Sequence, residues 1–215
     1  MRVTTLSQAA KFIDSAGFAY VFPDNRMPLP SLWGAVCGNP RREMDEDDWG
    51  WTKAVERTWG LKNDLGAERS AFFGRYFRGK GSLISLGMLP ALHAARRSDD
   101  PLSPDAKRAF ERLSNVGAMS TLRLRESLGL HGSKGHARFD KITVELYRRL
   151  LIATVGTDDT ETRWPSGVID TFKRAFPDVV RSKVVNPVDA LVTKFRATSP
   201  EATDRQIASL LGIRL

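Results

Sequence analysis

The segment 133–150 constrains the fold most, because it predicts one long helix with two chemically opposite sides. One side is apolar, with large residues recurring at intervals of three and four: Phe139, Ile142, Leu146 and Leu150. The other side is basic and carries Lys134, Arg138, Lys141 and Arg148. At about 100° per residue, each set falls on one side of a helix. We therefore expect the apolar side to be buried in a core and the basic side to face outward.

Two shorter helices are expected before this segment. The first begins at Ser103 and Pro104, because serine caps a helix and proline fits its first turn. Its apolar stripe consists of Ala106, Phe110, Leu113 and Val116. The second is capped by Ser120 or Thr121 and ends at Gly129, which suits a left-handed turn.

A β hairpin is expected after the basic helix. Residues 151–155 are β-branched and apolar enough for a strand, and "GTDDTET" is typical of a turn. Arg163 and Trp164, just before Pro165, could form the returning strand. The order helix, helix, turn, basic helix and hairpin is that of a winged helix. In that arrangement the basic helix enters the major groove of DNA, where lysine and arginine neutralise phosphates or bind guanine edges.

The distribution of charge favours an anionic partner. The 215 residues carry a net charge of +8, and residues 101–150 contain ten Lys/Arg against five Asp/Glu. The sequence "RGKG" adds Arg78 and Lys80, either on a hairpin tip that touches phosphate or on a plain hairpin, since it lacks the rest of a P-loop. A solvated helix face without any partner is the alternative interpretation of the basic helix. We expect double-stranded DNA as the partner.

The whole chain is expected to be mainly α with small β hairpins (α+β), in a tandem winged-helix or helix-turn-helix architecture. We predict three domains: an N-terminal winged-helix-like domain at 1–98, a central winged helix at 99–165 and a C-terminal helical segment at 166–215. "GVIDTFKRAFP" is expected to be helical, with Ile169, Phe172 and Phe176 buried. The tail, in which Thr203 caps the last helix, is either structural packing or a degenerate copy of the motif. No clear long-period repeat is visible.

Several other classes of protein are not favoured. The single cysteine, Cys37, excludes an internal disulfide and fits a reducing, cytoplasmic compartment. The longest uncharged stretch, 81–95, is too short for a membrane span and contains Pro90. The scattered histidines lack the spacing of metal ligands; they are His93, His131 and His136. We expect neither a metal nor any other cofactor.

The stretch "WGLKNDLGAERSAFFGRYFRGKGSLISLGMLPALHAA", followed by the expected winged helix, resembles the bacterial AlkZ/YcaQ family of winged-helix proteins. This family includes DNA glycosylases that unhook interstrand crosslinks. The resemblance covers residues 10–176 and is strongest from Trp59 to Leu92. It implies tandem winged helices wrapped around duplex DNA.

The resemblance also implies where catalysis would occur. The family's signature is a Gln-apolar-Gln or Gln-apolar-Asp triplet just after the first helix, and the corresponding residues here are Tyr20, Val21 and Phe22. Neither aromatic side chain replaces an amide or carboxylate that orients a hydrolytic water, so glycosylase activity is in doubt. The weak catalytic candidates nearby are Asp24, Asn25 and Arg26, which also have the composition of an ordinary turn.

Two further features remain open. The tryptophans Trp49, Trp51 and Trp59 could stack on exposed bases, although aromatic residues at near-helical spacing are more often core. Lys62 and Asp64 could pair with each other or face a cleft. The favoured function is therefore a repair-related binder of double-stranded DNA without the family's catalytic motif. The alternatives are a glycosylase for alkylated or crosslinked DNA, and a transcriptional regulator or protein-binding scaffold.

Overall fold

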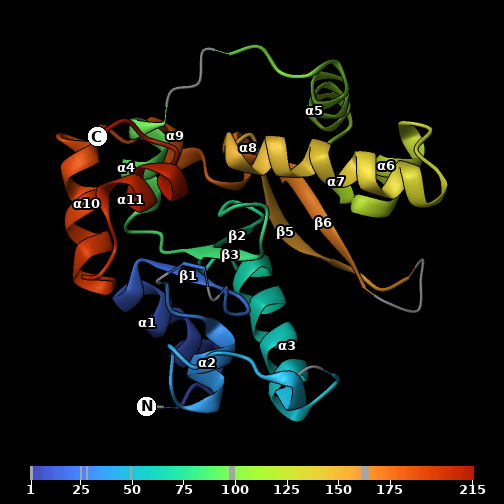
Figure 1. Ribbon diagram of the computed structural model, residues 1–215. Coiled ribbons are helices and arrows are strands. Elements are labelled where there is room, and N and C mark those ends of the chain that lie inside the picture. Colours follow the sequence, from blue (N-terminus) through green and yellow to red (C-terminus); the bar gives the residue numbers. More distant parts are fainter. Residues whose placement is uncertain (1, 25, 28, 49, 97–99, 161–164) are drawn as a thin grey trace.

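The computed structural model describes residues 2–24, 26–27, 29–48, 50–96, 100–160 and 165–215 (Figure 1). These residues form a mainly helical protein with two small three-stranded antiparallel sheets. This agrees with the expected α+β class.

The first sheet belongs to a group of elements that we call the first unit. It contains α1 (Leu6–Ala16), β1 (Phe18–Tyr20), α2 (Leu32–Cys37), the 3-10 turn η1 (Glu46–Asp48), α3 (Lys53–Ala67), β2 (Phe72–Gly74) and β3 (Ser82–Ile84). The strand order is β1-β3-β2, with Phe18 and Phe72 both opposite Ile84. The hairpin expected around "RGKG" is thus confirmed, with β2 and β3 on either side of it.

The second sheet belongs to the central unit. It contains α5 (Pro104–Val116), β4 (Met119–Ser120), α6 (Thr121–Ser127), α7 (Gly132–Arg148), β5 (Ile152–Asp158) and β6 (Ser166–Thr171). The strand order is β4-β6-β5. Leaving aside η1, both units therefore run helix, strand, helix, helix, strand, strand, and both place the third strand in the middle of the sheet.

The remaining helices complete the fold. They are α4 (Leu89–Ala95), α8 (Phe172–Ala175), α9 (Pro177–Arg181), α10 (Pro187–Thr198) and α11 (Asp204–Leu211). Figure 1 shows α4, α10 and α11 together on the side away from the β5–β6 hairpin. The hydroxyl of Tyr76 donates to the carbonyl of Leu211 at 2.8 Å, and Thr203 forms the expected cap of α11 through a reciprocal bond with Gln206. The tail thus packs against the first unit.

The basic helix is confirmed as α7, and its apolar stripe is buried. Phe139, Ile142, Leu146 and Leu150 are all at most 7% exposed. The turn before α7 is very tight, because a Cβ atom on Gly135 would lie 2.6 Å from the carbonyl carbon of Leu130. Only glycine permits this approach of α6 and α7.

The main apolar core is continuous from Phe18 to Ile213 and so crosses both predicted domain boundaries. The ring of Phe72 in the first sheet lies 6.0 Å from that of Phe172 and 6.2 Å from that of Phe176, between ring centres. A smaller cluster, which includes Ile13, lies under the first unit's helices. Residues 97–99, at the first predicted boundary, lie outside the described residues.

Three expectations about local structure were wrong or incomplete. The predicted helix at 167–177 is instead strand β6 followed by the short helix α8, since Val168 and Ile169 pair with β4 and β5 and this pairing outweighs helical spacing. The returning strand therefore lies after Pro165, and the predicted Arg163 and Trp164 lie outside the described residues. Val116, expected on the buried side of its helix, is 54% exposed at the helix end. None of the described helices is long and apolar enough to cross a membrane.

Candidate functional site

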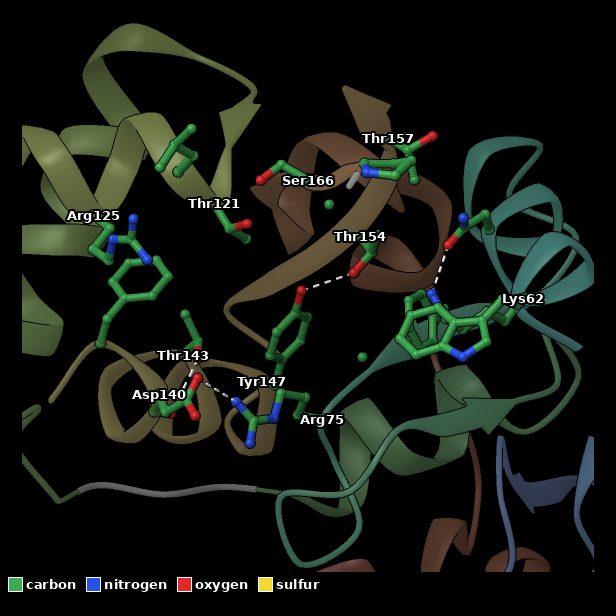
Figure 2. Close-up of a pocket in the computed structure, with 18 of the residues that line it drawn as sticks. Lys62, Arg75, Thr121, Arg125, Asp140, Thr143, Tyr147, Thr154, Thr157 and Ser166 are labelled. Carbon is green, nitrogen blue, oxygen red and sulfur yellow. Dashed lines mark hydrogen bonds and ion pairs between the residues drawn. The ribbon is translucent and has the colours of Figure 1, made fainter. Parts of the chain in front are cut away.

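A cleft of about 1050 Å³ lies between α3 of the first unit and α6, α7 and the β5–β6 hairpin of the central unit. Figure 2 shows polar side chains from both units around this space. The labelled lining residues are Lys62, Arg75, Thr121, Arg125, Asp140, Thr143, Tyr147, Thr154, Thr157 and Ser166. Because each unit supplies one wall, the cleft exists only when the two units are packed together.

Lys62 is a buried amine on the α3 wall of this cleft. Its residue is 6% exposed, and Nζ donates a hydrogen bond to Oδ1 of Asn63 at 2.6 Å. The ring of Trp59 lies 3.9 Å from Nζ and that of Phe73 lies 4.8 Å from it, measured to the ring centres. Burial lowers the pKa of Lys62 from 10.5 to about 8. The sequence left two possibilities for Lys62: a pair with Asp64, or a position at a cleft. In the structure Lys62 lies at the cleft, and Asp64 is exposed and forms no ion pair with it.

The opposite wall holds a buried hydroxyl pair. The hydroxyl oxygen of Tyr147 lies 2.7 Å from Oγ1 of Thr154, and burial raises the pKa of Tyr147 to about 12. A Cβ atom on Gly74 would lie 2.5 Å from the Tyr147 ring, so this glycine lets the first unit approach α7. Arg75 joins the same two units, because its Nη1 lies 2.8 Å from Oδ1 of Asp140.

Two tryptophans expected more often in a core are exposed at the cleft instead. Trp51 is 59% exposed and Trp59 is 42% exposed, and both line the cleft. The ring of Phe22 lies 6.1 Å from that of Trp59. Trp49 lies outside the described residues. Indole rings exposed beside a cleft are typical of surfaces that stack on planar ligands.

The predicted basic residues of α7 have different surroundings. Lys134 and Lys141 are exposed. Arg138 forms a bidentate pair with Asp105 at the start of α5, with Nη2 to Oδ1 at 2.8 Å, and this bond lowers the pKa of the Asp105 carboxyl. Arg148 is partly buried near Arg96; burial lowers the pKa of the Arg96 guanidinium, and the charge of Arg148 adds a smaller decrease. The pairing of Arg138 holds α5 against α7, which the sequence did not reveal.

The hairpin tip between β2 and β3 lies beside α7. A Cβ atom on Gly79 would be 3.3 Å from Cγ2 of Val144, and Val144 lies three and four residues from Lys141 and Arg148 on one helix face. Arg78 and Lys80, one on each side of Gly79, are both exposed at this tip. The structure thus gathers residues that were predicted separately into what we call the basic surface: Arg78, Lys80, Lys134, Lys141 and Arg148.

The three residues that the resemblance places at the family's triplet carry no amide or carboxylate side chain; they are Tyr20, Val21 and Phe22. Tyr20 is fully buried, its hydroxyl has no partner among the described residues, and burial raises its pKa. Val21 is 2% exposed, and its amide donates to the carbonyl of Gly81 at 2.9 Å. Phe22 contributes only its ring.

Two of the three weak catalytic candidates, Asp24 and Arg26, lie in a turn that does not line this cleft. The Asp24 carboxylate accepts from the amide of Arg26 at 3.3 Å, and its carbonyl accepts from the amide of Met27 at 2.9 Å. Asp24 and Arg26 line a separate hollow of about 340 Å³, together with Arg41 and Arg42. Asn25 lies outside the described residues. These contacts are those of the ordinary turn that was the alternative interpretation.

The three histidines are dispersed. His93 stacks on Phe172 with ring centres 5.4 Å apart, and burial lowers its pKa. His136 contacts the guanidinium of Arg125 at the cleft, and His131 precedes the first residue of α7. In the part of the chain that the structure describes, no three His, Cys, Asp or Glu residues are grouped as metal ligands would be.

Sequence reasoning missed most of the cleft. Four residues of the cleft were not singled out, because the contacts between them join residues from separate elements. They are Arg75, Asp140, Tyr147 and Thr154. One signal was available: Trp59 and Lys62 are three residues apart, so on a helix such as α3 an amine and an indole share one face.

The fold and cleft define a mainly helical protein whose two small sheets belong to units of matching order, with a polar and aromatic site at their junction. A family model described as "AlkZ related" matches residues 3–212. The chain therefore belongs to the AlkZ-related family, which confirms the resemblance seen in the sequence and relates the protein to DNA repair. Neither the curated proteins nor the solved structures gave a match.

Proposed function

We propose that this protein binds double-stranded DNA through tandem winged helices, in a role connected with DNA repair. The observation that carries the proposal is the order of the central unit, α5-β4-α6-α7-β5-β6 with sheet order β4-β6-β5, which is the order expected of a winged helix. The first unit has the same order, as the AlkZ resemblance implies for a tandem arrangement. The net charge of +8 supports an anionic partner.

The basic surface would contact the DNA backbone. Lys134 and Lys141 are exposed on α7, and the hairpin tip brings Arg78 and Lys80 to the same helix. Charges of this kind neutralise phosphates and give affinity that falls steeply with salt. Arg138 has a structural role in this proposal, since Asp105 already occupies its guanidinium. The Arg75–Asp140 pair marks the border between this surface and the cleft.

We further propose that the protein does not excise bases by the family's glutamine-based hydrolysis. Tyr20, Val21 and Phe22 support this, because they offer the cleft no group that activates water. Incubation of stoichiometric protein with duplex DNA containing an N7-alkylguanine should produce no abasic sites, measured as strand breaks after alkali. Abasic sites that depend on Asp24, tested with Asp24→Asn, would instead establish the glycosylase alternative.

Duplex binding can be tested by fluorescence anisotropy with a short labelled duplex. The double substitution Lys134→Glu with Lys141→Glu should greatly weaken binding, because it replaces two attractive charges with repulsive ones and leaves the buried stripe of α7 intact. The matched control is Lys11→Glu with Lys183→Glu, which makes the same charge change at exposed lysines on α1 and after α9. Thermal melts check that both variants fold. If both pairs weaken binding equally, the loss comes from the change in net charge and not from a contact at α7. If the unaltered protein does not bind duplex DNA at all, the protein-binding scaffold is favoured.

A further inference from the structure

The cleft contains an amine whose surroundings suit covalent chemistry better than phosphate binding. Nζ of Lys62 lies between the Trp59 and Phe73 rings and forms no ion pair with a carboxylate among the described residues. A lysine that holds phosphate works best exposed and fully charged, as Lys134 and Lys141 are. Removal of water from Lys62 favours its neutral form, which has the lone pair that a nucleophile needs.

The rest of the cleft could hold part of a DNA strand next to that amine. Trp51 and Trp59 are exposed along one side and can stack on a base. Arg125 stands on the wall of the central unit, where it adds positive potential to the cleft, whereas Arg75 is already paired with Asp140. The basic surface adjoins the cleft through Arg75, so a duplex bound there would lie beside the amine. A lysine amine reacts with carbonyl compounds. In DNA, an aldehyde is present at an abasic site, where the deoxyribose ring opens.

We propose that Lys62 is a nucleophile that forms a Schiff base with the aldehyde carbon of an abasic site in duplex DNA. The inference rests on the proposed DNA binding and adds a substrate class to the cleft.

The reaction balances without any oxidant or reductant. The neutral Nζ attacks the aldehyde carbon, a C–N bond forms and the carbonyl electron pair moves to oxygen. The nitrogen then gives up one proton, the oxygen takes up two and leaves as water, and a C=N bond forms with a net uptake of one proton. The Trp59 and Phe73 rings beside Nζ would stabilise the resulting cationic iminium by the same cation–π contact that they make with the ammonium.

Borohydride trapping tests this proposal with the full-length protein. A labelled duplex with one abasic site is incubated with the protein and sodium borohydride, which reduces a C=N bond to a stable amine and leaves a covalent complex on a denaturing gel. Peptide mapping of the complex should locate the adduct on Lys62. The variants Lys62→Arg and Lys62→Met should lose the adduct, while the matched control Lys11→Met, at an exposed lysine on α1 outside the basic surface, should retain it.

The pH dependence of trapping gives a second readout that a merely structural lysine would not produce. The rate should rise with pH and level off above about pH 8, where Lys62 becomes neutral. An ordinary surface lysine would continue to gain reactivity toward its pKa near 10.4.

Anisotropy with the same abasic duplex separates this inference from the proposed function. Binding by the unaltered protein without any trapped complex, or an adduct mapped to other lysines, would overturn the assignment of Lys62 and leave DNA binding standing. Absence of binding to any duplex would overturn both.

Discussion

The first unit and the central unit share an order of elements and an order of strands, yet their third helices do different things. In the central unit, α7 buries Phe139 and Leu146 and leaves Lys134 and Lys141 exposed. In the first unit, α3 turns one face to the cleft and buries Lys62 there between aromatic rings. The third helix of one unit therefore leaves these two lysines exposed, while the third helix of the other unit buries a lysine at the cleft.

The difference arises from what packs beside each helix. A Cβ atom on Gly66 of α3 would lie 3.5 Å from the carbonyl oxygen of Thr154, so α3 is pressed against strand β5 of the other unit. The outer face of α7 meets the hairpin tip at Gly79, and Lys134 and Lys141 on it remain exposed. A repeated topology thus does not imply a repeated surface, because neighbouring elements decide which residues reach solvent.

The contact between the units can be broken at Gly74, and this should be the largest effect. A Cβ atom there would lie 2.5 Å from the Tyr147 ring and 3.0 Å from the Phe72 ring, both buried. We expect Gly74→Ala to lower the free energy of unfolding by about 3 kcal/mol, the cost of an overpacked core. The measurement is urea denaturation. The control is Gly60→Ala on α3, where an added Cβ meets nothing within 4 Å and should stabilise the helix or leave it unchanged. Equal effects of the two substitutions would contradict the close packing of the units.

Replacement of Lys62 sharpens the contrast between the two helices. In the folded protein its pKa is about 8, below the ordinary 10.5, so the folded state binds fewer protons than the unfolded state between these values and stability rises with pH in that window. Below pH 8 the full cost of the buried charge is present. Lys62→Met should therefore stabilise the protein at pH 7 by about 2 kcal/mol, with a gain that shrinks from pH 8 to pH 9.5. Lys141→Met, at an exposed position, should change stability little at either pH. A destabilised Lys62→Met protein at pH 7 would show that the amine supports the fold.

The hydroxyl pair on the α7 wall should give a smaller effect. Tyr147→Phe leaves Oγ1 of Thr154 buried without its partner, at a cost of about 1 kcal/mol in unfolding free energy. The double variant with Thr154→Val removes both hydroxyls and should recover most of that loss. Thermal melts of the two single variants and the double variant provide the measurement. Additive losses would mean that the two hydroxyls do not depend on each other.

Local signals in the sequence predicted the helices well and the cleft poorly. The stripe of α7 and the caps of α5 and α11 depend on residues within a few positions, so their spacing was sufficient. Strand β6 was mistaken for a helix, because Ile169, Phe172 and Phe176 fit helical spacing while the pairing with β5 is non-local. The sequence predicted a DNA contact for Arg138. Its partner Asp105 lies 33 positions away in the sequence and reaches it only in the folded chain. The cleft could not be predicted, since its walls meet only through packing between the units.

The central claim is that the basic surface, rather than the cleft, supplies the phosphate contacts to duplex DNA. The salt dependence of binding tests it most directly, because each phosphate contact adds to the slope of log K against log salt. Anisotropy titrations on an intact duplex across a salt series should give a slope flatter by about 2 for Lys134→Glu with Lys141→Glu. Trp59→Ala, which alters the cleft, should leave that slope unchanged. An unchanged slope for the lysine pair, or a slope flattened as much by Trp59→Ala, would contradict the division of roles between the basic surface and the cleft.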